Sequence, residues 1–117
     1  MDDSLLNLRE KINAFVNERD WAQFHTPKNL AMAMIVEAAE LVEIFQWDTP
    51  IESQQLTVEK RQAIAHELAD NFVYLLRIAE VLEIDIIKAA NEKIELNAQK
   101  YPVDKVKGNN AKYTKYT

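Results

Sequence analysis

Apolar residues recur at helical spacing along most of this chain, and little in the sequence interrupts them. The first such stretch covers residues 4–19, where the apolar positions are Leu5, Leu8, Ile12, Phe15 and Val16. This three-and-four spacing places them on one face of a helix. The 117 residues include one glycine and three prolines, so residues that favour tight turns are scarce. We therefore expect a single domain of the all-α class.

Capping residues mark where the second helix begins. Thr26 has the character of an N-cap, and Pro27 suits the first helical position because its missing N–H has no partner there anyway. From Pro27 the apolar pattern runs to about Gln46. The segment before it, residues 19–26, is rich in aromatic residues and is predicted to be a connector.

Two further helices are expected after a break that contains Thr49, Pro50 and Thr57. Asp85 is a plausible N-cap for the last one, and Pro102 would end it. The expected ranges are residues 58–82 and 86–100. Together the four helices predict a four-helix bundle-like domain.

The C-terminal segment differs from the rest of the chain. It has no apolar period and carries lysines at positions 105, 107, 112 and 115. We expect the helical domain to cover residues 1–102 and a basic, extended tail to cover residues 103–117.

Charge and composition exclude several classes of function. A net charge of −5 argues against binding to a nucleic acid polymer. The chain has no cysteine, hence no disulfide framework, thiolate nucleophile or zinc–thiolate cluster. No apolar run approaches the about 18 residues of a membrane span, and the acidic start does not resemble a signal peptide. These features fit a cytoplasmic protein.

Two pairs of carboxylates stand out on the central helices. Glu37 and Glu40 are three residues apart, and Glu67 and Asp70 repeat the spacing on the next helix. Side chains three apart share a helix face. Two antiparallel helices could therefore direct all four carboxylates at one point.

The surroundings of these acids are apolar, which makes four simple surface charges improbable. The segment 27–46 is apolar almost all round, so we expect it to be buried on more than one side or to form an oligomer interface. Its only basic residue is Lys28, whereas on the following helix Arg77 is close enough in sequence to pair with Asp70. Buried carboxylates without cations repel one another and are costly to desolvate.

A divalent cation would relieve that cost. Di-iron and di-manganese bundles use Glu-x-x-His pairs, but here His66 follows Ala63 and His25 lies in the connector. A donor set made only of carboxylates favours a hard cation, Mg²⁺ or its substitute Mn²⁺.

The acid pairs belong to a longer pattern. Glu37-x-x-Glu40 followed by Glu67-x-x-Asp70 resembles the signature of the MazG-like all-α nucleoside triphosphate pyrophosphohydrolases. Further segments resemble the branch that includes the dCTP pyrophosphatases: Arg19-Asp20-Trp21, Phe24 through Leu30, Phe45-Gln46-Trp47, Lys93 through Asn97, Tyr101-Pro102 and Lys112-Tyr113. The resemblance covers roughly residues 10–115.

The resemblance implies an activity. Members of this family hydrolyse a nucleoside triphosphate to the monophosphate and pyrophosphate with Mg²⁺, as homo-oligomers that are commonly tetramers in this branch, although a dimer is also conceivable. It implies metal ligands at Glu37, Glu40, Glu67 and Asp70, and a nucleotide pocket lined by Trp21, His25, Trp47 and Tyr74. Some members that prefer dCTP have a histidine where this chain has Ile12.

Other roles follow from general chemistry. A carboxylate not fully used by a cation could act as general base, and Glu40 is the first candidate with Glu43 second. Lys93 and Asn97 share a stripe of the last helix and either face the triphosphate or are simply solvated. The rival to an enzyme is a non-catalytic helical module that binds nucleotide or protein, in which the acids are structural.

Overall fold

The computed structural model describes residues 3–108, which contain five α-helices, two short 3-10 helices and no strand. The expected all-α class is therefore confirmed. Contacts divide the chain into two compact units, one ending at Ile84 and the other beginning at Asp85. Within the described residues no helix is long and apolar enough to cross a membrane.

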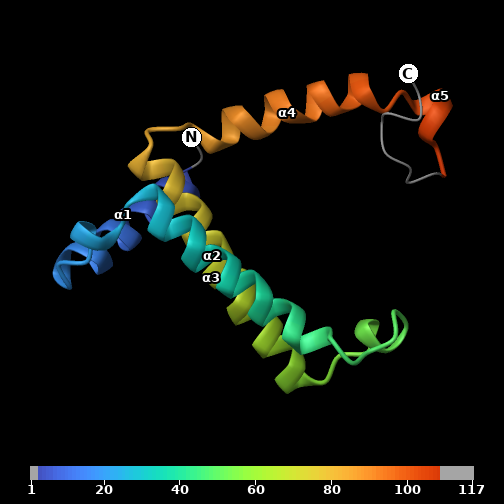
Figure 1. The fold of residues 1–117 in the computed structure, drawn as a ribbon, viewed down its shortest axis with the longest axis horizontal. Coiled ribbons are helices and arrows are strands. Elements are labelled where there is room, and N and C mark those ends of the chain that lie inside the picture. Colours follow the sequence, from blue (N-terminus) through green and yellow to red (C-terminus); the bar gives the residue numbers. More distant parts are fainter. Residues whose placement is uncertain (1–2, 109–117) are drawn as a thin grey trace. The chain divides into compact units, whose positions relative to one another are not determined.

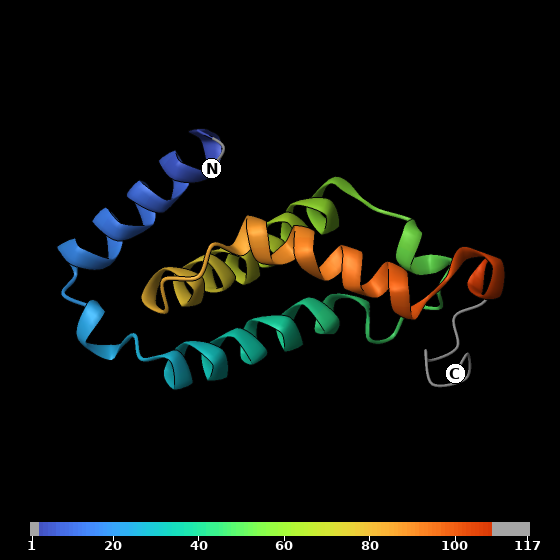
Figure 2. The ribbon, with the colours of Figure 1, turned by 90° about the horizontal axis from the view of Figure 1, so that it is seen from above.

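Three helices build the first unit. They are α1 (Asp3–Glu18), α2 (Pro27–Phe45) and α3 (Val58–Val81). α2 and α3 lie side by side as an antiparallel hairpin (Figures 1 and 2), and α1 packs against α3. The buried apolar residues come from all three helices: Leu5, Ile12, Val16, Leu30, Leu76 and Ala79.

The helices begin where their N-caps predict, and every expected boundary is met within one residue. Thr26 Oγ1 accepts a hydrogen bond from the Asn29 amide at 3.2 Å, and Thr57 Oγ1 accepts one from the Lys60 amide at 3.1 Å. Each bond satisfies an amide that has no partner inside its own helix.

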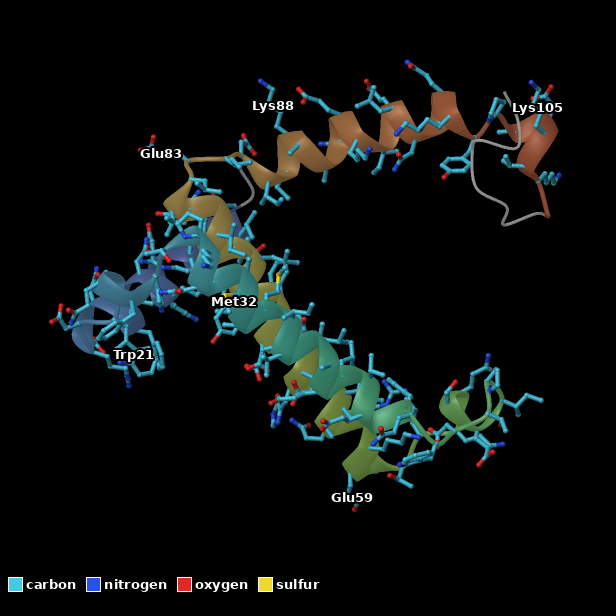
Figure 3. The ribbon with its side chains drawn as sticks, in the orientation of Figure 1. Trp21, Met32, Glu59, Glu83, Lys88 and Lys105 are labelled. Atoms are coloured by element: carbon cyan, nitrogen blue, oxygen red, sulfur yellow. The ribbon has the colours of Figure 1, made fainter. Side chains whose placement is uncertain are left out.

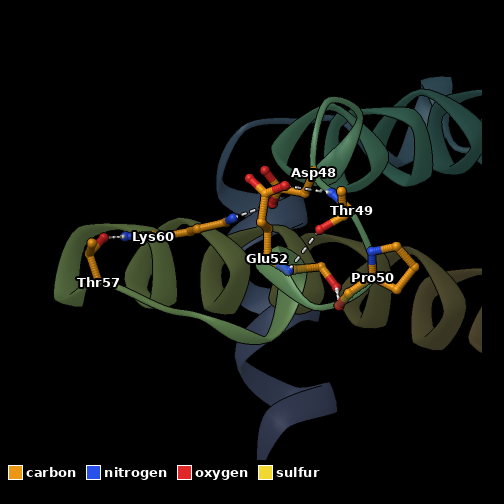
Figure 4. A network of polar contacts seen from close by, with 7 residues as sticks. Asp48, Thr49, Pro50, Glu52, Thr57 and Lys60 are labelled. Atoms are coloured by element: carbon orange, nitrogen blue, oxygen red, sulfur yellow. Dashed lines mark hydrogen bonds and ion pairs between the residues drawn. The ribbon is translucent and has the colours of Figure 1, made fainter.

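The connector between α2 and α3 is held by polar contacts rather than by apolar burial (Figure 4). The turn that leads into a short 3-10 helix, Glu52–Gln54, has the reciprocal bonds of a capping box: the Glu52 amide donates to Thr49 Oγ1 at 3.2 Å, and the Thr49 amide donates to Glu52 Oε1 at 3.4 Å. Lys60 of α3 forms an ion pair with Asp48. These contacts fix how the chain leaves α2 and enters α3.

A Schellman motif ends α1. The Trp21 amide bonds the Val16 carbonyl at 3.0 Å, and the Asp20 amide bonds the Asn17 carbonyl at 3.1 Å. Asp20 takes a φ of 55°, the left-handed conformation that this motif requires. The turn reverses the chain and brings Trp21 back over the last turns of α1, where its ring contacts Phe15 edge-on at 5.6 Å between centroids.

The second unit contains α4 (Ile86–Lys100) and α5 (Val103–Val106). Asp85 caps α4, since its side chain accepts a hydrogen bond from the Lys88 amide at 3.1 Å. The prediction of an extended tail is wrong for residues 103–106, which form one helical turn. The carbonyl of Pro102 accepts bonds from the Lys105 and Val106 amides, because a proline that ends one helix is also pre-set to begin another. Residues 109–117 of the predicted tail lie outside the described residues.

α2 is not enclosed within its own unit. Only Leu30 is buried, whereas Met32, Ile35, Val36 and Val42 are all more than half exposed. Figure 3 marks Met32 on α2. A helix with this much exposed apolar surface usually packs against a partner. Phe24 is 58% exposed, and the 3-10 helix that contains it, Ala22–Phe24, has no buried residue.

We expect Thr57→Ala to lower the free energy of unfolding by about 1 kcal/mol, because the Lys60 amide loses its cap. Thr57→Ser keeps the accepting hydroxyl and is the matched control. Urea denaturation at one fixed protein concentration measures both. Equal losses in the two variants would contradict the capping role.

Candidate metal centre and pocket

Three of the four predicted acids meet where α2 packs against α3. One carboxylate oxygen from each of Glu37, Glu67 and Asp70 lies within 4.8 Å of the others. Around an octahedral Mg²⁺, adjacent ligands are about 3.0 Å apart and opposite ligands about 4.2 Å apart, because each Mg–O distance is about 2.1 Å. A small movement of these flexible side chains would therefore close the cluster around one cation.

Two oxygens of the cluster are left without partners. Glu37 Oε2 and Glu67 Oε2 are buried, and neither has a hydrogen-bond partner among residues 3–108. A buried oxygen without a donor costs free energy, the more so when it is charged. Both atoms are available as ligands, and a donor set made only of oxygens fits Mg²⁺ or Mn²⁺.

Burial and the crowding of like charges both shift the pKa values of the cluster. Burial, followed by the hydrogen bond and the negative charge of Glu40, raises the pKa of Glu37 to about 7. Burial and the charge of Glu40 also raise the pKa of Glu67. In the absence of a cation, the fold therefore favours a proton on Glu37 near neutrality, and it shifts the pKa of Glu67 in the same direction.

The two candidates for general base differ in position. Glu40 is half-buried and interacts with both Glu37 and Glu67. Glu43 is exposed, and no hydrogen bond or ion pair reaches it from the described residues. The structure thus brings Glu40 to the cluster and leaves Glu43 on the surface of α2.

A pocket of about 430 Å³ adjoins the acids. Such a volume suits a small-molecule ligand. Its lining includes three predicted nucleotide-binding residues, Trp21, His25 and Tyr74, together with Glu37 and Asp70. Trp21, marked in Figure 3, follows the end of α1, which is where the Schellman motif places it.

Tyr74 is an aromatic residue of the pocket that lies close to the acids. Burial and the charges of Glu37, Asp70 and Glu40 raise the pKa of its phenol. The hydroxyl therefore keeps its proton at neutral pH and remains a hydrogen-bond donor.

Three predicted binding residues do not line this pocket. Trp47 follows α2 and is 88% exposed. Lys93 and Asn97 are exposed residues of α4, in the second unit. Their contact with a nucleotide stays a prediction.

The sequence interpretation missed other residues of the pocket. Lys11, Phe15, Val73 and Arg77 line it, and so does Ile12. Arg77 does not form the expected pair with Asp70. Its Nε donates to His25 Nδ1 at 3.0 Å, and its Nη1 donates to Asn13 Oδ1 at 3.0 Å. A sequence signal did exist, because Arg77 is three residues after Tyr74 and so shares its helix face.

In metal-free protein we expect the free energy of unfolding to fall as the pH rises from about 4.5 to about 7. Because the folded state raises the pKa of Glu37, it holds a proton across this window that the unfolded chain has released, and stability then decreases with pH. Urea denaturation with a chelator across a pH series measures the slope.

Glu37→Gln is the control for this pH dependence, since it keeps the side-chain shape without the charge. The decrease should become shallower in this variant, and added Mg²⁺ should stabilise the wild type most above pH 7. An identical slope in wild type and Glu37→Gln would refute the assignment.

Comparisons with known proteins agree with this geometry. A sequence model of the MazG-like family matches residues 32–115. The chain is 38% identical over 115 residues to dCTP pyrophosphatase 1 of Mus musculus, an alignment covering 97% of this chain and 68% of that protein. The protein of the same name from Homo sapiens is 36% identical over the same shares of both chains.

A solved structure shows the same fold. A pyrophosphatase from Archaeoglobus fulgidus superimposes with a TM-score of 0.81 and 37% identity, covering 87% of this chain and 95% of that one. With acids gathered beside an aromatic pocket and a family match over most of the sequence, this chain belongs to the MazG-like family.

Proposed function

We propose that this protein is a Mg²⁺-dependent nucleoside triphosphate pyrophosphohydrolase. It converts a deoxynucleoside triphosphate and water into the monophosphate and pyrophosphate, with dCTP as the first substrate to test. The observation that carries the proposal is the position of Glu37, Glu67 and Asp70 beside a pocket of about 430 Å³ with an aromatic wall. The relatives named dCTP pyrophosphatase 1 support the choice of substrate.

The acids have a role only if positive charge accompanies the substrate, because a triphosphate would otherwise be repelled. Glu37, Glu67 and Asp70 would hold Mg²⁺, with Glu40 as a fourth ligand, and Mn²⁺ is a possible substitute. A cation bound there supplies charge neutralisation for phosphate oxygens and a site that orients water.

The remaining chemistry falls to the side chains around the cluster. Glu40 is half-buried beside Glu37 and is our candidate to take the proton of the attacking water, with Glu43 as the second candidate. Trp21 offers a flat face for a base, a contact that tolerates different bases. Phosphoryl transfer depends mainly on positioning and electrostatics, so no nucleophilic side chain is required.

We further propose that the enzyme is a homo-oligomer, with a tetramer favoured over a dimer and a cytoplasmic location. Exposed apolar residues of α2, among them Ile35 at 69% and Val42 at 62%, would be covered by a second subunit. Trp47, Lys93 and Asn97 are exposed in this chain and so are free to reach a nucleotide in an assembled site.

The reaction is tested by product identity. With Mg²⁺ and dCTP we expect equal amounts of dCMP and pyrophosphate, and Glu67→Gln should lower kcat by at least about a hundredfold because a ligand charge is lost. Chromatography of the nucleotides together with a pyrophosphate assay measures both.

Glu59→Gln is the matched control, since Glu59 is an exposed glutamate in the first turn of the same helix, and its kcat should equal that of the wild type. Inorganic phosphate and dCDP as products would contradict the proposed reaction. If dCTP is bound but not hydrolysed, and Glu67→Gln leaves that binding unchanged, the chain is instead a binding module.

The oligomer is tested by one added charge. Ile35→Glu places a carboxylate in the exposed apolar surface of α2 and should shift the protein to a smaller species at micromolar concentration. Asn7→Glu adds the same charge at an exposed polar position of α1 and should leave the size unchanged. Light scattering after size exclusion gives both masses, and an unaltered mass for Ile35→Glu would refute this interface.

A further inference from the structure

Arg77 lies in the pocket wall but faces no carboxylate of the acid cluster. Within residues 3–108, its guanidinium donates to His25, in the turn before α2, and to Asn13, in α1. The positive charge of Arg77 is therefore not paired with Asp70, and its partners are both uncharged side chains.

The bond to His25 determines which imidazole nitrogen carries the proton. A guanidinium has five N–H donors and no acceptor. His25 Nδ1, which receives the Arg77 Nε–H at 3.0 Å, must therefore be the unprotonated nitrogen. The neutral ring then has its proton on Nε2, so the assignment follows from donor chemistry alone.

The guanidinium is itself held in place from both sides. Asn13 Oδ1 accepts from Arg77 Nη1 at 3.0 Å, while Asn13 Nδ2 donates to Glu80 Oε1 at 3.2 Å. Glu80 in turn forms an ion pair with Arg9. This series of contacts links α1 to α3 and leaves Arg77 little freedom to turn away from His25.

The free end of His25 is available to a ligand. His25 lines the pocket, and no residue in the described part of the chain bonds its Nε2. Its neighbours on the pocket wall include the aromatic pair of Phe15 and Trp21. An uncharged N–H beside aromatic rings is better suited to an uncharged acceptor on a base than to a phosphate. The phosphates would instead be bound by the cation at the acid cluster.

We propose that Arg77 is a positioning residue for substrate recognition: it fixes His25 as the Nε2–H tautomer, and the imidazole donates that hydrogen to an acceptor on the nucleobase. This role rests on the proposed function of the pocket. Arg77 acts through His25 and does not itself contact the substrate.

Charged groups of both signs surround His25. Lys11 of α1, Glu37 of α2, and Asp70 and Arg77 of α3 line the same pocket. Burial, followed by the charge of Arg77, lowers the pKa of His25. Protonation of Nδ1 would also set two donors against each other.

The first test measures kinetics on the intact protein with dCTP. Arg77→Met keeps an unbranched apolar stem and removes the guanidinium with its donors. We expect KM to rise about tenfold, which corresponds to about 1.4 kcal/mol, the upper end of the usual worth of one hydrogen bond, while kcat changes by less than about threefold. Arg61→Met, at an exposed arginine of the same helix, is the control and should leave KM unchanged.

A double-mutant cycle separates this role from a general structural one. If Arg77 acts through His25, Arg77→Met should add little to the KM of His25→Ala, so the double variant stays near a tenfold increase. An additive, hundredfold increase would overturn the proposal. His25→Gln, which retains an N–H near the position of Nε2, should recover part of the lost affinity.

Nitrogen NMR of ¹⁵N-histidine protein provides a readout independent of activity. We expect His25 of the wild type to show one neutral tautomer with the proton on Nε2, and Arg77→Met to show mixed tautomers and a higher pKa for the ring. His25→Ala identifies the signal. A wild type with the proton on Nδ1 would refute the proposal, whereas absence of pyrophosphate release would refute only the proposed function.

Discussion

The packing of α2 against α3 forces carboxylates of like charge together, and the rest of the site depends on this contact. Glu37, Glu67 and Asp70 present oxygens within 4.8 Å of one another, and two of the buried oxygens have no partner among residues 3–108. Such an arrangement costs free energy in the metal-free protein, as the raised pKa of Glu37 indicates. A hard divalent cation bound between these carboxylates would offset their repulsion. The cost in free energy and the proposed metal binding therefore have the same origin.

A second constraint determines where the ligand can lie. α1 ends in a Schellman motif with Asp20 in the left-handed conformation, and this turn returns Trp21 to the side of Phe15. The pocket thus has an aromatic wall from α1 and its turn, and an acidic wall from α2 and α3. The two walls match the two ends of a nucleotide. A flat, uncharged base can stack on the aromatic wall, and a triphosphate can approach the acidic wall when cations are bound there.

Much of this could be predicted from the sequence because the signals are local. Thr26, Thr57 and Asp85 cap their helices through bonds to amides three residues on, which is the range that sequence patterns describe. The acid cluster was predictable because i, i+3 spacing fixes a helix face. Arg77 was misassigned because local rules favoured Asp70, whereas its partners His25 and Asn13 are 52 and 64 residues away. The turn Val103–Val106 was missed because Pro102 was interpreted only as a helix end.

The most direct test of the central claim is to locate the cation. Crystals grown or soaked with Mn²⁺, and measured near the manganese absorption edge, should show an anomalous peak between the carboxylates of Glu37, Glu67 and Asp70, within ordinary metal–oxygen distances of all three. No peak at this position, or a manganese ion bound only by other residues, would contradict the account.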